Sequence, residues 1–164
     1  MFIVEPIKKE EAQGELKEFY TTVENMMGII PPHFQLYASI DIKGMKEFLN
    51  YNIKMMNHKA IDANLLPYLR LEIAKRECRN YCINFNTQIL KAKGVEDLDH
   101  PDLDAKQIAL MNKVLKGIYK SSEFTKNDIS ELEALGFEHK DFFDLLNYST
   151  NFMAKSKTIE VYSI

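Results

Sequence analysis

Apolar residues recur every three or four positions along almost the whole chain, and the strict alternation of a half-buried strand is rare. This spacing places apolar side chains on one face of an α-helix, and that face needs a partner to cover it. The sequence therefore predicts an all-α fold, in which glycine and proline residues separate about seven to eight helices.

The boundaries of the predicted helices are set by these glycine and proline residues and by capping residues. A proline disfavours the helical region for the residue before it, so Pro31 and Pro32 predict a stiff connector after a first helix that ends at Gly28. Thr125 and Asp128 have the spacing of a capping box, which predicts a helix start. We expect helices over residues 8–27, 32–40, 41–58, 62–73, 79–93, 104–120, 125–136 and 139–156, a loop over 95–103 and an extended tail over 158–164.

Length and composition predict one domain. The chain has 164 residues and 46% hydrophobic content, which is enough to bury a core of its own. No linker is long enough to divide it, so we expect a single helical domain over residues 1–164.

Charge and hydropathy argue against several function classes. The net charge is -3 and no basic run is flanked by aromatic residues, so we expect no nucleic-acid partner. No apolar stretch approaches the roughly 18 residues of a membrane helix, so we expect no membrane partner. The start of the chain lacks the basic and apolar regions of a secretory signal. Two cysteines in such a chain fit a reducing compartment, which predicts a cytoplasmic location.

Both cysteines lie in one short stretch, four residues apart, at Cys78 and Cys82. On one continuous helix they would share a face, with Cα atoms about 6 Å apart, near the upper edge for an unstrained disulfide. A helix break just before them would instead place Cys82 in the first turn of a helix, where the dipole and unpaired N–H groups favour a thiolate. The alternative is two small buried apolar side chains without chemistry.

A zinc site is not indicated, because two cysteines fall short of four ligands and no histidine lies within five residues of either one. The sequence shows no signature of another metal or of a cofactor, and we predict none.

Three segments together resemble a known family. They are Gly28-Ile-Ile-Pro-Pro-His-Phe34, the stretch from Leu66 to Cys82, and the stretch from Phe124 to Phe137. In this order and spacing the chain resembles the AhpD-like, or carboxymuconolactone decarboxylase-like, helical proteins from Glu11 to Ser156. The resemblance implies an AhpD-like helical bundle, assembly as a homo-oligomer, and a dithiol electron donor as the partner of any thiol chemistry.

The functional positions of that family are only partly kept. Its redox members have C-x-x-C, a histidine four residues after the second cysteine, and a glutamate twelve before the first. Cys82, preceded by Tyr81, takes the second-cysteine position, whereas the first falls on Arg79 and Cys78 lies one residue early. The histidine position falls on Asn86 and the glutamate position on Pro67. The family's proton relay is therefore not encoded at its usual places.

Four other residues are candidates for binding or for a substitute relay. Glu72 could supply a carboxylate from the preceding helix, although a helical glutamate beside arginines is more often an ion-pair partner. His33, after the two prolines, could approach the thiols from another segment. Asn86 can hydrogen-bond a thiol or ligand but cannot exchange a proton near neutral pH. Tyr81 completes the candidate binding set beside Cys82.

Three functions stay open on these grounds. The first is a thiol-dependent peroxidase or disulfide reductase, with Cys82 as the reactive thiol and Cys78 as the resolving partner. The second is a non-catalytic or ligand-binding descendant of the scaffold. The third is a decarboxylase or other lyase acting on a small acid.

One further expectation concerns burial. Apolar residues are spread around more than one face of the predicted helix 79–93, so we expect this helix to be the most buried one in the assembled protein. Phe85 is its central aromatic residue.

Overall fold

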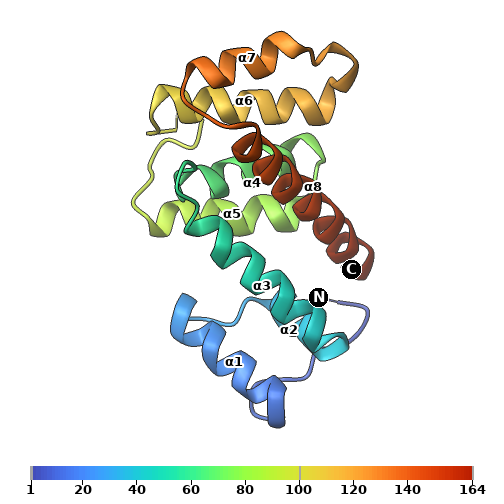
Figure 1. Ribbon diagram of the computed structural model, residues 1–164. Helices are drawn as coiled ribbons and strands as arrows, with labels where there is room; N and C mark the ends of the chain where they lie inside the picture. Colours follow the sequence, from blue (N-terminus) through green and yellow to red (C-terminus); the bar gives the residue numbers. More distant parts are fainter. Residues whose placement is uncertain (1, 100, 164) are drawn as a thin grey trace. The chain divides into compact units, whose positions relative to one another are not determined.

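The computed structural model describes residues 2–99 and 101–163, and within them the regular structure is helical apart from a single bridge between Phe2 and Ser163 (Figure 1). The elements are α1 (Gly14–Met27), α2 (Pro32–Ile40), α3 (Ile42–Met56), α4 (Leu65–Arg76), α5 (Asn80–Ala92), α6 (Ala105–Tyr119), the short 3-10 turn η1 (Ser121–Glu123), α7 (Lys126–Ala134) and α8 (His139–Tyr162). The predicted all-α fold of seven to eight helices is confirmed.

Several predicted boundaries are confirmed by their local chemistry. Helix α1 ends at Gly28, whose φ of 75° lies in the left-handed region and whose N–H donates to the carbonyl of Glu24. Helix α7 begins with the predicted capping box of Thr125 and Asp128. The segment between α5 and α6 is a loop wherever the structure describes it.

Some predicted boundaries are wrong, and the helix predicted over 62–73 is Leu65–Arg76 in the structure. Residues 8–13 are not part of the first helix, because Gly14 has a φ of 52° that separates α1 from a turn at Lys8. The tail is not extended, because α8 continues to Tyr162. Ile159 is buried beyond the predicted end at residue 156, and this burial stabilises the added turns.

The chain separates into two compact units. Unit 1 comprises the described residues of Met1–Ile53 and Thr158–Ile164, and unit 2 comprises Lys54–Lys157. The core of unit 1 is a cluster of α1, α2 and α3 side chains around Tyr20, which is fully buried, and Phe34. The Tyr20 hydroxyl donates to the carbonyl of Ile7 at 2.8 Å and so fixes the first residues of the chain on this core.

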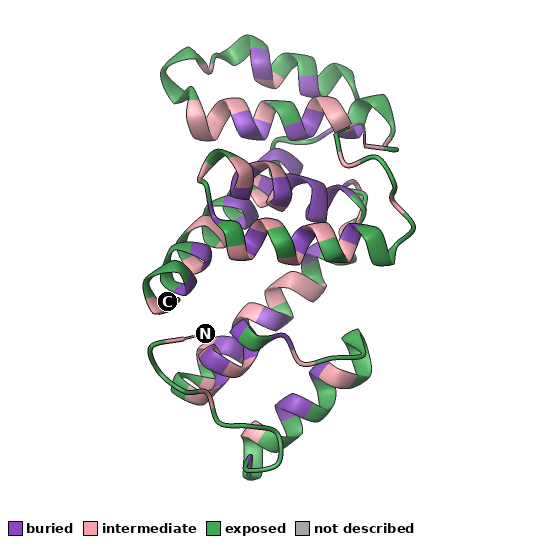
Figure 2. Cartoon of the chain, turned by 180° about the vertical axis from the view of Figure 1, so that it is seen from behind, coloured by how far each residue is buried: buried purple, intermediate pink, exposed green. Residues whose placement is uncertain are grey.

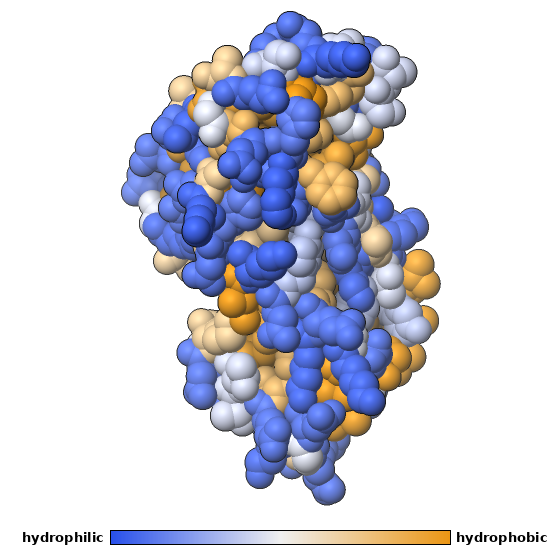
Figure 3. Space-filling model, in the orientation of Figure 1, coloured by the Kyte–Doolittle hydropathy of each residue, from blue (hydrophilic) through white to orange (hydrophobic). Residues whose placement is uncertain are grey.

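The surfaces of the two units differ. Unit 1 has more of the large hydrophobic residues that remain exposed, among them Ile3, Met26, Ile29 and Ile40. Figure 3 shows such hydrophobic patches between hydrophilic side chains, which dominate the visible face of α6 and α7. No helix in residues 2–99 and 101–163 is both long enough and apolar enough to cross a membrane.

Helix α4 is the centre of unit 2. Residues on all its faces are buried, from Leu65 to Ala74, and it lies beside α5 (Figures 1 and 2). Helix α5 buries only Cys82, Asn86 and Leu90. Within one copy of the chain α4 is thus the more buried helix, and the expectation that α5 is the most buried helix of the assembly stays a prediction. The other apolar side chains of α5, including Phe85, are half-buried, and its exposed residues Asn84, Gln88 and Lys91 lie opposite the buried ones.

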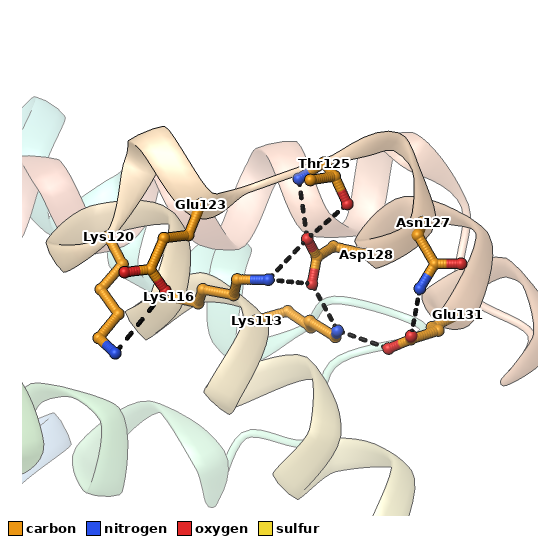
Figure 4. Close-up of polar contacts among 8 residues, drawn as sticks. All are labelled: Lys113, Lys116, Lys120, Glu123, Thr125, Asn127, Asp128 and Glu131. Carbon is orange, nitrogen blue, oxygen red and sulfur yellow. Dashed lines mark hydrogen bonds and ion pairs between the residues drawn. The ribbon is translucent and has the colours of Figure 1, made fainter.

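An ion-pair network joins α6 to α7 (Figure 4). The buried carboxylate of Asp128 accepts hydrogen bonds from Lys113 at 2.6 Å, from Lys116 at 2.8 Å and from the Thr125 N–H at 2.8 Å. These donors, Lys113 first, hold the pKa of Asp128 well below its usual range. The capping box already holds Asp128 at the start of α7. Its carboxylate therefore ties α7 to α6 through the two lysines.

Candidate functional site

The linker Glu77–Arg79 between α4 and α5 contains the first cysteine. The Arg79 N–H donates to the Ala74 carbonyl at 2.9 Å, and the Cys78 N–H donates to the Lys75 carbonyl at 3.2 Å. These two bonds form a Schellman motif, in which Cys78 occupies the position that glycine usually takes. The helix break considered from the sequence is thereby confirmed.

Cys78 has an unusual backbone for a residue with a side chain. Its φ is 54°, and it is the one non-glycine residue with positive φ in the described part of the chain. Left-handed backbone costs an ordinary residue about 1–2 kcal/mol, and such strain concentrates at functional sites. Because Cys78 is also exposed, its thiol is presented to solvent at a strained turn.

The second cysteine lies at the start of α5. Cys82 is the third residue of the helix, within the first turn where backbone N–H groups have no helical acceptor. Its side chain is buried, with 4% of the residue exposed. The two cysteines are not joined by a disulfide. One thiol therefore faces solvent and the other faces the interior of unit 2.

Charged groups surround the linker. Arg79, which is 9% exposed, binds the Glu77 carboxylate at 3.1 Å. Burial first, and then the charge of Glu77, raise the pKa of the nearby Tyr119 hydroxyl to about 12, against the opposing influence of Arg76 and Arg79. The linker thus packs against α6. Its last residue, Arg79, places a basic side chain between Cys78 and the helix that contains Cys82.

Asn86 is the centre of a buried polar network. Its carbonyl oxygen accepts from Nε of Arg70 at 2.7 Å, and its amide nitrogen donates to the Cys82 carbonyl at 2.8 Å. Arg70 also donates to the hydroxyl of Tyr148 on α8. Asn86 thus stands where the family resemblance places a histidine, one helical turn after Cys82. Its hydrogen bonds link α4, α5 and α8.

The other candidate residues lie apart from this network. Glu72 pairs with Lys75 at 3.3 Å, which is the ion-pair alternative considered for it. Tyr81 is half-buried and its ring lies parallel to that of Phe85 at a centroid distance of 6.5 Å. His33 is buried in unit 1 and meets Phe34 edge-on, so it belongs to the other unit from the thiols. A relay through His33 or Glu72 stays a prediction.

Two residues of the network were not identified from the sequence. Arg70 had a visible signal, because it interrupts an otherwise apolar run from Leu65 to Leu71 and a cation there needs a partner. Tyr148 had none, since its hydroxyl reaches Arg70 only through the packing of α8. Across residues 2–99 and 101–163, no group of three or more His, Cys, Asp or Glu side chains could hold a metal ion.

Solved structures share this fold. An uncharacterized peroxidase-related protein from Ralstonia eutropha JMP134, described as an alkylhydroperoxidase AhpD core, is 16% identical, with a TM-score of 0.77 over 97% of this chain and 92% of that one. An uncharacterized peroxidase-related protein from Silicibacter sp. TM1040 is also 16% identical, with a TM-score of 0.76 over 97% of this chain and 85% of that one. No protein-family model and no curated protein sequence matches the chain. The predicted AhpD-like fold is confirmed by these likenesses, which at this identity extend to the fold alone.

Proposed function

We propose that Cys78 and Cys82 form a redox-active thiol pair that reduces a hydroperoxide. The observation behind this proposal is the exposed Cys78 in a strained left-handed turn, directly before a helix whose first turn contains Cys82. The peroxidase-related names of the proteins with this fold point the same way.

The reaction balances with a hydroperoxide and a dithiol as the two co-reactants. The thiolate of Cys82 attacks the terminal peroxide oxygen, the O–O bond breaks, and the alkoxide leaves as an alcohol after taking a proton. The resulting sulfenic acid condenses with the Cys78 thiol, which forms a disulfide and releases water. A dithiol donor then reduces this disulfide by exchange, and the exposed Cys78 is the sulfur that such a donor meets first.

The test is the alkylation rate of each thiol against pH, measured on Cys78→Ser and Cys82→Ser. We expect the remaining Cys82 to react as a thiolate below the ordinary thiol range, and to be protected by prior treatment with one equivalent of peroxide. An ordinary titration of Cys82, or reaction only in denaturant, would contradict the peroxidase proposal.

The second candidate is a descendant of the scaffold that has lost redox catalysis. The network of Arg70, Asn86 and Tyr148 favours it, because this network fills the histidine position with groups that cannot accept a proton near neutral pH. The substitution Asn86→His separates the two candidates. If the ancestral site persists, peroxide-dependent oxidation should accelerate about 100-fold or more, the usual contribution of a general base.

Arg70 must be included in that experiment. Its guanidinium lies 2.7 Å from the Asn86 side chain and would repel an imidazolium at this position. In the double variant Arg70→Gln with Asn86→His, the introduced imidazole is the better base, since the neutral glutamine removes the repulsion. An unchanged rate in both correctly folded variants favours the non-catalytic candidate.

We also propose that the chain forms a homo-oligomer in the cytoplasm. The support is the family resemblance and the half-buried apolar side chains Tyr81, Phe85 and Ile89, which recur every four residues along one side of α5. Light scattering after gel filtration tests the assembly, and a monomer at all concentrations would contradict it.

A further inference from the structure

A groove lies in unit 2 between the end of α4 and one face of α6. Its volume is about 350 Å³, within the range of small-molecule sites. Leu115 and Tyr119 of α6 supply its apolar lining, and Arg76 of α4 overhangs it. No step of the thiol reaction uses these side chains.

Arg76 has no carboxylate partner in the part of the chain that the structure describes, although acidic residues lie near it in the sequence. Glu72 pairs with Lys75 and Glu77 pairs with Arg79, at 3.3 and 3.1 Å. Among the described residues, the Arg76 guanidinium forms no ion pair and lies over the ring of Tyr119, 5.3 Å from its centroid. Its planar set of donors therefore remains available to an anion.

The other charges of the groove leave it positive. Lys116 is neutralised by Asp128, whose two oxygens both lie 2.8 Å from its nitrogen (Figure 4). Lys120 and Glu123 are 3.7 Å apart with side chains 63% and 61% exposed, so water screens their attraction. Arg76 and Lys120 thus face the groove against the single carboxylate of Glu123.

The Tyr119 hydroxyl adds no charge to the groove. It is buried, and Glu77 lies beside it. Burial first, and then the charge and a hydrogen bond of Glu77, raise the pKa of this hydroxyl. With a pKa of about 12 this hydroxyl keeps its proton at neutral pH.

We propose that this groove binds a small organic carboxylate with a flat apolar body. The two carboxylate oxygens match the paired N–H groups of Arg76, which a point charge such as lysine cannot match as well. The apolar body lies against the groove wall that Tyr119 and Leu115 form, with most of the contact on Tyr119 because Leu115 is already buried, with 4% of the residue exposed. The site goes beyond the proposed thiol reaction and does not depend on it.

The experiment titrates the full-length protein with sodium benzoate and follows backbone amides by NMR. We expect shifts at Asn112 and Tyr119, which line the groove. Arg76→Gln should weaken binding about tenfold or more, since it removes a charge-assisted pair of hydrogen bonds. Arg76→Lys should weaken it by a smaller factor, because the charge stays and the planar geometry is lost.

Matched controls separate a local from a general charge effect. Lys91→Gln removes one cation from an exposed position on α5 outside the groove and should leave benzoate affinity unchanged. Lys120→Gln is a second groove variant at an exposed position, and a several-fold loss is expected there as well. Thermal melting of each variant verifies the fold.

Three results would overturn the proposal. The first is an absence of shifts at the groove, or equal benzoate affinity in Arg76→Gln and the unchanged protein. The second is inorganic phosphate binding as tightly as benzoate, which would mean a site for any anion. The third is neutral benzamide binding as tightly, which would mean that the carboxylate is not recognised.

Discussion

Helices α4 and α5 lie side by side on the two sides of the Cys78 turn, yet their surroundings differ (Figure 2). Helix α4 buries eight of its 12 residues and α5 only three of its 13. Both have apolar residues on more than one face, so this pattern alone does not decide which helix becomes central. The neighbours decide it, because α5 and α6 both contact α4.

The largest change in stability that tests this contrast is expected for a substitution in α4. Leu69 is fully buried, and Leu69→Ala should lower the free energy of unfolding by about 2–5 kcal/mol through lost burial and the cavity left behind. Urea unfolding followed by circular dichroism measures it. Leu135→Ala, at a residue that is 44% exposed, is the control and should change little.

The next effect tests the polar contact between the two helices. Asn86→Leu removes the acceptor of Arg70 and the donor to the Cys82 carbonyl, and should cost about 2 kcal/mol because buried polar groups lose their partners. Asn84→Leu is the matched control, because Asn84 is exposed on the same helix. If both substitutions have the same effect, the network does not hold α4 to α5.

A smaller effect is expected on the side of α5 that Tyr81, Phe85 and Ile89 share. Because Phe85 is half-buried, Phe85→Ala should cost about 1 kcal/mol, less than truncation of a fully buried aromatic residue. The measurement is urea unfolding at two protein concentrations. A loss as large as that of Leu69→Ala, and present only at high concentration, would mean that another copy of the chain covers this face.

The smallest effect is a gain in stability. Cys78→Gly should raise the free energy of unfolding by about 0.5–1 kcal/mol, because glycine adopts the left-handed turn without steric cost. Cys78→Ala removes the same thiol but keeps the steric cost, so the difference between the two variants isolates the backbone. A glycine variant that is less stable than the alanine variant would contradict the strain at this turn.

The sequence predicted the fold closely where local chemistry dominates. The capping box at Thr125 and the glycine stop at Gly28 act within one helical turn, so their sequence neighbours determine them. The break at Cys78 could be stated only as an alternative to a continuous helix, because no glycine or proline marks it. The extra turns of α8 were missed because burial of Ile159 stabilises them, and burial depends on residues far away in the chain.

For the candidate site, the sequence by itself determined the residue types: two cysteines four positions apart, and Asn86 and Pro67 where the family resemblance places histidine and glutamate. These facts are fixed by the order of residues and bound the chemistry that is possible. Tertiary structure alone decided that Cys78 is exposed in a left-handed turn, that Cys82 is buried, and that Arg70 and Tyr148 meet at Asn86. Exposure, strain and contacts between helices arise from packing between distant segments, which periodicity along the chain does not encode.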